Sequence, residues 1–395
     1  DIYLVSGVKM VYVFCIPIAI ELIKRKINLR KKDIFLLLWY LSYFLSAGHI
    51  ISMADFWVVL IGQLVLFVIY FYFESIRNYK FIQKCNYWFQ KSLYVMVVIG
   101  IVQLVLYYTV GSTWGISHIT HGVGLPRMSS LSREPDWYGV ICMMAFIFMA
   151  INILSHKYFW SKKIDIAVAI VALLMLILSL TRAAWVGLFS SICVFLIIKT
   201  QKRFSQVLKK RFKKYLFIIV PCAVIGCFGL YLSGNSAFLK LMQRLNVFQW
   251  TSNDGGAADS RSYAIGVMLY YFKQHPFTGN GVGSMNAIAS NKTLLASLGY
   301  MYDINAGRGN ANIIVTNLFD VGIFGTVCLG IFFIFQIKEM IVDYKKNQNT
   351  MQLTYLMILV GLLVDFQFNN GLRSPYVWII LGLSTALSRI NWKAI

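Results

Sequence analysis

Arginines have the clearest chemical capacity in this sequence. Arg182 interrupts an apolar run of about 35 residues, which extends from residue 164 to residue 198. Arg261 and Arg308 lie in a long segment of mixed polarity that separates two other apolar runs. A guanidinium presents a planar fork that binds phosphate through two hydrogen bonds, and a lysine ammonium does not. These positions predict a site for an anionic ligand that contains phosphate.

Carboxylates near these arginines are candidates for a general base, since a positioned carboxylate can accept a proton during a reaction. Glu134 is the first choice, and Asp303 and Asp259 follow. His118 and His121 have a spacing that would place them on one face of a helix as half of a metal site, but no third ligand is evident. We expect no metal or other cofactor.

Other motifs have simpler interpretations. Gly279, Gly281 and Gly283 alternate as in some nucleotide-binding loops, but no predicted strand precedes them, so we interpret the segment as a turn. Asp320 and Asp365 lie in or near apolar runs, where a charge usually has a partner or a function. Asp365 either pairs with an arginine such as Arg373 or contacts a substrate.

The elements that position these residues are membrane helices. The chain is 58% hydrophobic and 13% charged, which argues against a soluble enzyme. Apolar runs long enough to cross a bilayer recur throughout, and we expect eleven to twelve membrane helices. Eleven spans are predicted at about 2–20, 34–50, 56–74, 92–111, 136–154, 164–180, 183–199, 215–233, 311–336, 352–369 and 375–390. They define an N-terminal bundle (1–233), a large extracytoplasmic loop (234–310) and a C-terminal bundle (311–395).

Basic residues predict the orientation. If the Lys24–Lys32 cluster is cytoplasmic, alternation places 26 Lys and Arg inside and ten outside, as the positive-inside rule requires. Seven of the ten outer basic residues are Arg, against six of the 26 inner ones, which favours an outer phosphate ligand over a purely topological role. The same alternation places Asp1 outside, so we expect a preceding helix. The excess of +22 is thus a topology signal, and we expect no nucleic-acid partner.

The run 164–198 must be a hairpin. As a single helix it would be ~52 Å long, whereas the hydrocarbon core is ~30 Å thick. Both of its flanks are basic and so lie on the same side of the membrane. Thr181 and Arg182 are therefore expected at the outer tip.

Several short segments resemble one known family, in order along the chain. Residues 179–185 (SLTRAAW) resemble the Ser/Thr-Arg hairpin of the O-antigen ligase and polymerase superfamily. Residues 259–261 (DSR) and 276–283 (PFTGNGVG) are similar to the arginine helix and the proline-glycine turn of its large outer loop. Residues 312–322 resemble the entry to the next span, and residues 133–139 (REPDWYG) resemble the Glu-Pro element of polysaccharide-repeat polymerases.

The resemblance implies a helical fold of the GT-C type and a metal-independent, inverting glycosyl transfer from undecaprenyl-pyrophosphate-linked sugars. It places the protein in the bacterial cytoplasmic membrane, with an active site that faces outward. Its expected partners are lipid-linked oligosaccharides, membrane lipids and a chain-length regulator protein. Ligases carry a histidine at the entry to the helix after the large loop, and here that position is Ala311. This departure favours the polymerase branch and leaves the general base open.

The candidate residues follow from this assignment. The catalytic candidates are Arg182, Arg261, Arg308 and Glu134, and the substrate-binding candidates are Arg133, Arg244, Asp259, Asp303, Asn312, Asp365 and Arg373. The alternatives are a ligase that transfers glycan to a terminal acceptor and a transporter of lipid-linked oligosaccharides. A transporter would be expected to have repeated halves and charges deep in several spans, and the sequence has no internal repeat.

Overall fold

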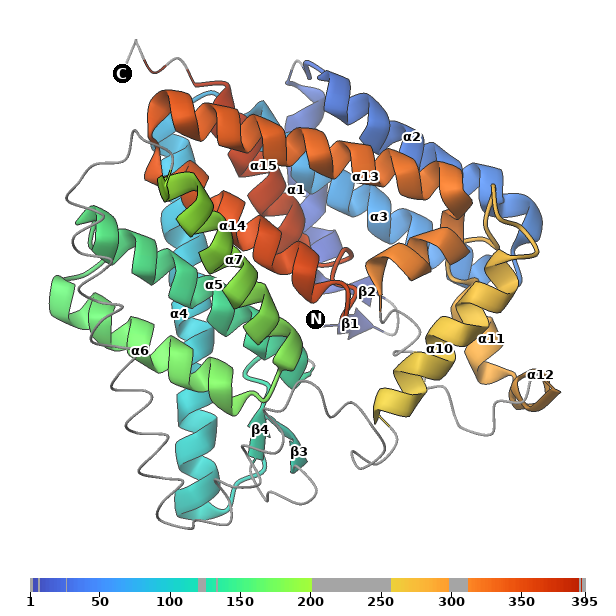
Figure 1. Ribbon diagram of the computed structural model, residues 1–395, viewed down its shortest axis with the longest axis horizontal. Helices are drawn as coiled ribbons and strands as arrows, with labels where there is room; N and C mark the ends of the chain where they lie inside the picture. The colour runs from blue at the N-terminus through green and yellow to red at the C-terminus, as the bar shows by residue number, and fades with distance from the viewer. Residues whose placement is uncertain are drawn as a thin grey trace. The chain divides into compact units, whose positions relative to one another are not determined.

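The computed structural model describes residues 3–5, 8–25, 27–119, 126–132, 134–200, 257–297, 312–390 and 392. In these ranges the chain is mainly helical (Figure 1). The helices are α1 (Met10–Ile23), α2 (Lys31–Leu45), the short 3-10 helix η1 (Ser46–His49), α3 (Met53–Ser75), α4 (Tyr79–Val110), α5 (Pro135–Ser155), α6 (Lys162–Leu178), α7 (Arg182–Thr200), α10 (Ala257–Phe272), α11 (Ser284–Ser290), α12 (Lys292–Ser297), α13 (Ile313–Asn347), α14 (Thr350–Asp365) and α15 (Pro375–Ser388). Two small antiparallel strand pairs accompany them, β1 (Tyr3–Val5) with β2 (Val8–Lys9) and β3 (Ile116–Ile119) with β4 (Pro126–Met128). The predicted all-α class is confirmed.

Helices occupy ten of the eleven predicted spans, and the remaining one, 215–233, lies outside the described residues. Among the described helices, α3, α4, α5 and α13 are each long and apolar enough to cross a membrane. The protein is therefore an integral membrane protein, while the total number of spans and their orientation stay predictions. The first predicted span was wrong at its start, because α1 begins at Met10. Aromatic and β-branched residues precede it, and these favour the strands β1 and β2.

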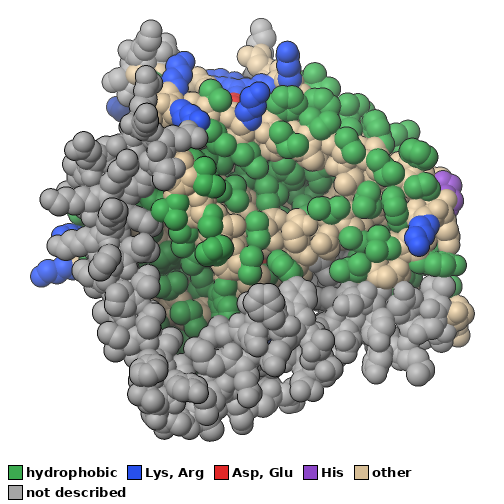
Figure 2. All heavy atoms as spheres, viewed as in Figure 1, with side chains coloured by type: hydrophobic (Ala, Val, Ile, Leu, Met, Phe, Trp, Pro, Cys, Tyr) green, Lys and Arg blue, Asp and Glu red, His purple; other side chains and the backbone are tan. Residues whose placement is uncertain are grey.

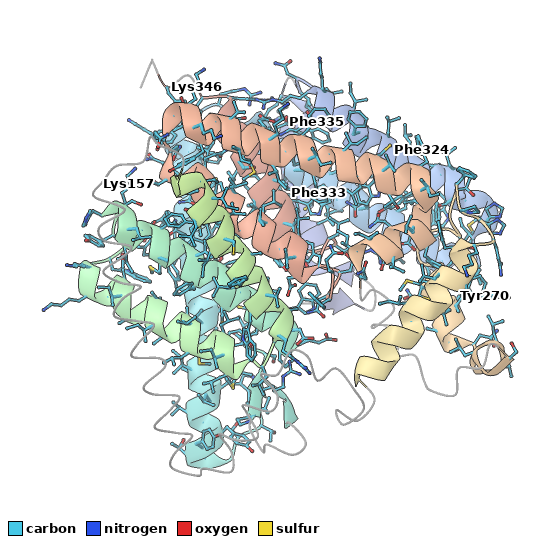
Figure 3. All side chains as sticks on the ribbon, in the orientation of Figure 1. Lys157, Tyr270, Phe324, Phe333, Phe335 and Lys346 are labelled. Atoms are coloured by element: carbon cyan, nitrogen blue, oxygen red, sulfur yellow. The ribbon has the colours of Figure 1, made fainter. Side chains whose placement is uncertain are left out.

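The surface has the character expected of helices that contact lipid. Large apolar side chains are exposed on several helices, including Ile23 (84%), Phe189 (68%) and Ile334 (67%). Soluble monomers rarely expose extensive apolar patches. Hydrophobic side chains cover much of the described part of the face in Figure 2, and many of its Lys and Arg side chains gather at the edge where α13 ends, near Lys346 (labelled in Figure 3).

The chain divides into two compact units that are discontinuous in sequence. Unit 1 comprises residues 1–85, 252–359 and 365–395, and unit 2 comprises residues 86–251 and 360–364. The predicted boundaries at residues 233 and 310 concern topology across the membrane and stay predictions.

Unit 1 is built on two long helix pairs, α2 with α13 and α3 with α15. Trp39 of α2 and Trp378 of α15 are both buried, and their rings stack with centroids 6.3 Å apart. The Nε1 of Trp39 also donates to Oδ1 of Asn317 on α13, at 2.9 Å. Aromatic packing and a buried hydrogen bond thus join three of these helices.

A group of six charged residues, here called the inner charge cluster, lies where α2, α3, α13 and α15 meet. Its members are Arg30, Lys32, Asp33, Glu74, Glu339 and Arg389, three basic and three acidic. Nζ of Lys32 lies 2.8 Å from Oε2 of Glu339, which also pairs with Arg30. Arg389 pairs with Glu74, whose side chain is 1% exposed. By the predicted topology this cluster is at the cytoplasmic end.

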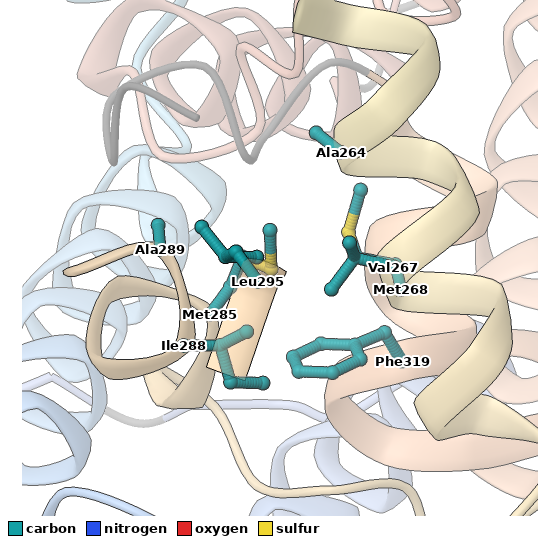
Figure 4. Packing of buried hydrophobic residues seen from close by; sticks show 8 residues of the cluster. All are labelled: Ala264, Val267, Met268, Met285, Ile288, Ala289, Leu295 and Phe319. Carbon is teal, nitrogen blue, oxygen red and sulfur yellow. The ribbon is translucent and has the colours of Figure 1, made fainter. Parts of the chain in front are cut away.

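The segment 257–297 forms a small helical layer in unit 1, against the first part of α13 (Figure 4). One face of α10 carries three buried residues: Ala264, Val267 and Met268. They pack with side chains of α11 and α12 and with Phe319 of α13: Met285, Ile288, Ala289 and Leu295 complete the cluster.

Unit 2 is organised around α5, which packs along α6 and α7. Pro135 starts α5, a position where its missing N–H removes no helical hydrogen bond. The helix is almost fully buried, and the hydroxyl of Tyr138 donates to the carbonyl of Val97 on α4, at 3.2 Å. Gly100 on α4 leaves the space that the Tyr138 ring fills. These contacts fix the start of α5, next to the turn between α6 and α7.

Candidate functional site

The turn between α6 and α7 carries Arg182, as the hairpin prediction required. Helix α6 ends at Leu178 and α7 begins at Arg182 itself. Leu180 between them has φ +55°, a left-handed conformation that is uncommon for a residue other than glycine. A cation at a helix N-terminus opposes the helix dipole. Helix stability through the dipole therefore does not explain why an arginine occupies this position.

Strand β4 and the start of α5 pack directly against this turn. Arg127 on β4 makes an ion pair with Asp136, with Nη2 2.7 Å from Oδ1, and its Nε donates to the carbonyl of Ser179 at 3.0 Å. Oγ1 of Thr181 donates to the same Asp136 oxygen at 3.3 Å. Gly139 permits the approach, since a Cβ there would lie 2.7 Å from Cβ of Thr181. Arg127 and Asp136 are not among the candidate residues predicted from the sequence. Asp136 could have been recognised as an acidic residue in the first turn of a predicted helix, a position where a negative charge is favourable.

Glu134 lies beside the turn with its carboxylate uncommitted to the helix it precedes. It is the N-cap residue of α5, but its side chain makes no capping hydrogen bond and is exposed. The carbonyl oxygen of the next residue, Pro135, lies 3.3 Å from Oγ1 of Thr181. The backbone next to Glu134 therefore contacts the residue next to Arg182. In unit 2 the candidate base, Glu134, and the candidate phosphate-binding residue, Arg182, thus lie near each other.

A second group of candidates lies in unit 1, where α13 is broken. Gly322 has φ +68° and ψ −170°, values outside the helical range. The turn 276–283 lies along the break: the amide of Asn280 donates to the carbonyl of Phe319 at 2.7 Å, and the amide of Ile323 donates to that of Pro276 at 2.8 Å. The turn predicted for residues 279–283 is confirmed, and all three of its glycines have positive φ. It supplies the hydrogen bonds that the broken helix loses.

Asp320 and Arg373 meet beside this break. Nη2 of Arg373 lies 3.4 Å from Oδ2 of Asp320, and the two side chains are 36% and 10% exposed. For the described part of the chain, the acidic partner of Arg373 is therefore Asp320 and not the predicted Asp365. Asp365 itself is fully buried at the end of α14. The sequence suggested Asp365 as a possible partner of Arg373 and gave no reason to choose Asp320.

Asn312 has a structural task at the start of α13. Its Oδ1 accepts hydrogen bonds from the amides of Ile314 and Val315 at 2.9 and 3.0 Å, and its Nδ2 donates to the carbonyl of Gln367 at 3.0 Å. This is N-capping combined with a tie to the loop after α14. Its proposed contact with substrate stays a prediction.

A pair of histidines stacks in unit 1 next to the turn 276–283. The rings of His49 and His275 lie with centroids 3.6 Å apart and are inclined by 15°. Burial, and next the neighbouring His49, lower the pKa of His275 below its usual value. The helical spacing considered for His118 was wrong, because His118 lies in strand β3.

The remaining candidates are only partly described. Asp259 and Arg261 lie in the first two turns of α10, and only their backbone is described. Arg133, Arg244, Asp303 and Arg308 lie outside the described residues. The predicted arginine clamp is thus represented by Arg182 alone, and the grouping of the others around it stays a prediction.

Comparison with known proteins supports the resemblance found in the sequence. Residues 167–330 match the model of a family described as O-antigen ligase. The matched range includes the Arg182 turn, the turn 276–283 and the break at Gly322, whereas Glu134 and Arg373 lie outside it. No curated protein matches the chain. The match confirms the resemblance to the O-antigen ligase and polymerase superfamily, whose members are glycosyl-transfer enzymes of polysaccharide biosynthesis.

Proposed function

From this family match and the Arg182 turn, we propose that the protein polymerises oligosaccharide repeat units linked to undecaprenyl pyrophosphate, at the outer face of the bacterial cytoplasmic membrane. The product is an O-antigen or a capsular polysaccharide. The observation that carries the proposal is the arginine at the first position of α7, held in a buried turn beside the exposed Glu134.

The reaction follows from the chemistry of these groups. A sugar hydroxyl of the acceptor repeat attacks the anomeric carbon of the donor glycan, and the bond from that carbon to the diphosphate oxygen breaks. The diphosphate lipid leaves with the electron pair, and the hydroxyl proton passes to a base. Attack from the face opposite the leaving group inverts the anomeric configuration.

Arg182 would act on the leaving group. Negative charge grows on the bridging oxygen as the bond breaks, and a preorganised cation stabilises that charge more than water does. Arg261 and Arg308 are proposed to complete the clamp, with Arg133, Arg244 and Arg373 as further phosphate contacts. A guanidinium fork spans two phosphate oxygens and a lysine does not.

Glu134 is proposed as the base. Its carboxylate is exposed and makes no hydrogen bond to the helix end that it caps, so it is available to a hydroxyl group. Asp259 and Asp303 are the alternatives, and both precede α13 along the chain. Proton removal by a positioned carboxylate contributes typically ~10²–10⁴-fold to a rate.

The test is polymer formation by the purified protein in detergent, with lipid-linked repeat units as the only substrate. Polymer in micelles identifies an enzyme, since a transporter requires a sealed bilayer. The alternative of a ligase is favoured by the description of the matched family. A ligase would leave the repeats unpolymerised and transfer them to an added terminal acceptor such as a lipid A core.

Arg182→Lys is the decisive variant within this assay. It keeps the charge and removes the fork, so we expect turnover to fall by about tenfold or more, the loss of at least one hydrogen bond to a charged group. Arg77→Lys is the matched control, because Arg77 donates to the carbonyls of Glu74 and Ile76 at the other, predicted cytoplasmic side. Equal polymer length and rate in both variants would exclude the fork.

A further inference from the structure

The contacts of Arg127 point to a role that differs from that of the other outer arginines. We propose that Arg127 is a positioning residue: it ties the start of α5 to the end of α6 and thereby sets where α7 begins and how Arg182 is presented to a diphosphate. This inference rests on the proposed function of Arg182.

The guanidinium of Arg127 is already engaged within the protein. Its Nη2 pairs with Asp136 at 2.7 Å, and its Nε donates to the carbonyl of Ser179 at 3.0 Å. The side chains of Arg127 and Asp136 are each 19% exposed, so water competes only partly for this pair. Two donors of the fork are therefore engaged within the protein, and the residue is poorly suited to bind a substrate phosphate with the whole fork.

The two acceptors of Arg127, the carbonyl of Ser179 and the carboxylate of Asp136, both lie at helix ends. Ser179 is the C-cap residue of α6, where carbonyls lack helical partners, and a basic side chain there is favourable. Asp136 lies in the first turn of α5, where a negative charge is favourable. Arg127 thus joins the end of α6 to the start of α5, and each helix end is stabilised by the contact. One of the two contacts is to Ser179, three residues before Arg182.

The turn between α6 and α7 depends on contacts with neighbouring residues to keep its conformation. Leu180 holds a left-handed conformation, and such residues persist where their surroundings enforce it. Ser179 and Thr181 on either side are almost fully buried, at 0% and 2% exposure. Oγ1 of Thr181 reaches Asp136, which is the partner of Arg127. Removing Arg127 would therefore loosen both residues that flank Leu180.

The strand that carries Arg127 is itself held in place by its neighbours. It lies in β4, where it pairs with His118 in the strand register, and the neighbouring Met128 is fully buried. Beyond β4, the amide of Ser130 donates to Oε1 of Gln103 on α4 at 2.9 Å, and Nε2 of Gln103 donates back to the carbonyl of Ser130 at 3.0 Å. Strand β4 is thus attached to α4, and Arg127 connects the strand to the turn between α6 and α7.

The test compares Arg127→Lys with wild type in two measurements on the full-length protein in detergent. One is binding of geranylgeranyl diphosphate by calorimetry, and the other is the kcat and KM of polymerisation. A lysine reaches one of the two acceptors but not both, so we expect about tenfold weaker diphosphate binding, the loss of one hydrogen bond to a charged group. Asp136→Asn, which leaves the size of the side chain unchanged, is expected to act in the same direction.

A double-mutant cycle separates positioning from a general structural effect. If Arg127 acts through Arg182, Arg127→Lys should cause little further loss of diphosphate binding in the Arg182→Ala protein. In the Arg77→Lys protein the loss should be as large as in wild type. Losses that multiply in the Arg182→Ala background, unchanged binding in Arg127→Lys, or the absence of diphosphate binding by wild type would each overturn the inference.

Failure of the proposed function gives a different result. If wild type binds geranylgeranyl diphosphate and the cycle behaves as expected, but no polymer forms, then Arg127 positions Arg182 in an enzyme or carrier of another specificity. If polymer forms and the cycle shows independent residues, the polymerase stands and the positioning role does not.

Discussion

Arg373 forms an ion pair with Asp320, whose side chain is 10% exposed, two residues before the break in helix α13. The pair connects the loop that precedes α15 with the first part of α13. The turn 276–283 lies on the same stretch, since the amide of Gly281 donates to the carbonyl of Asp320 at 3.2 Å. Asp320 is therefore held through both its side chain and its backbone.

Replacement of this carboxylate is expected to loosen the loop before α15. Asp320→Asn should lower the free energy of unfolding by about 1–3 kcal/mol, the usual effect of removing a hydrogen-bond partner from a charged group. Arg373→Lys, which keeps the charge, should cost less. Thermal unfolding in detergent measures both variants. An unchanged melting temperature in Asp320→Asn would show that the ion pair does not contribute.

The glycine at the break offers a test with an internal control. A Cβ on Gly322 would lie 2.3 Å from the carbonyl oxygen of Phe277, and its φ of +68° is itself unfavourable for alanine. Gly330, two turns further along the same helix, has open space around it. Gly322→Ala should therefore destabilise the protein strongly. Gly330→Ala should be neutral or more stable by roughly 0.5–1 kcal/mol, the usual gain of alanine over glycine within a helix.

Equal melting temperatures in the two alanine variants would show that the break at Gly322 tolerates a Cβ, and would contradict this account. The comparison is made by thermal unfolding, and polymer formation by the folded protein gives a second measurement. A loss of activity confined to Gly322→Ala would indicate that the contact with the turn 276–283 also supports the site.

The sequence predicted the helices and the Arg182 hairpin because each rests on a local rule. Length and apolarity determine which segments can cross a bilayer, and two basic flanks on one side require a reversal between them. The break at Gly322 could not be predicted in this way. It depends on one hydrogen bond from the amide of Asn280 to the carbonyl of Phe319 and another from the amide of Ile323 to the carbonyl of Pro276, and both turn residues lie far earlier in the chain. By length and hydropathy, α13 has the properties of an ordinary membrane span.

The same limit applies to charged partners. Outer arginines were recognised as a group, but the sequence does not separate Arg127, which is engaged by Asp136 and Ser179, from Arg182. Asp365 was the predicted possible partner of Arg373, whereas the structure pairs Arg373 with Asp320. The choice between them is made by tertiary contacts, in this case by the segment that lies along the break.

Glu134→Gln tests the proposed base. The side chain is exposed and makes no capping hydrogen bond, so the variant should unfold at the wild-type temperature. Its turnover should fall by ~10²–10⁴-fold if the carboxylate removes the hydroxyl proton. Glu21→Gln is a suitable control, because Glu21 pairs with Arg25 on the predicted cytoplasmic side. Wild-type turnover in Glu134→Gln would transfer the role to Asp259 or Asp303.

The inner charge cluster should support stability without taking part in the reaction. Glu74→Leu removes the carboxylate that pairs with Arg389, whose side chain is only 10% exposed, and breaking such a buried pair costs about 3–5 kcal/mol. The double variant Glu74→Leu/Arg389→Leu should recover part of that loss, since no unpaired charge remains buried. Thermal unfolding measures the series. A double variant less stable than Glu74→Leu would contradict this account.

The histidine stack predicts a pH dependence of stability. Burial and the neighbouring His49 lower the pKa of His275, so the folded state disfavours its protonated form. As the pH falls through the unfolded value of about 6.5, the unfolded chain takes up a proton that the folded chain resists, and stability decreases until the folded pKa is passed. The melting temperature should therefore fall between about pH 7.5 and 5.5, and His275→Asn should reduce that slope. His156→Asn is the control. His156 contacts Tyr158 through Nδ1, and it belongs to unit 2, whereas both stacked histidines belong to unit 1. Equal slopes in wild type and His275→Asn would show that the stack does not couple protonation to folding.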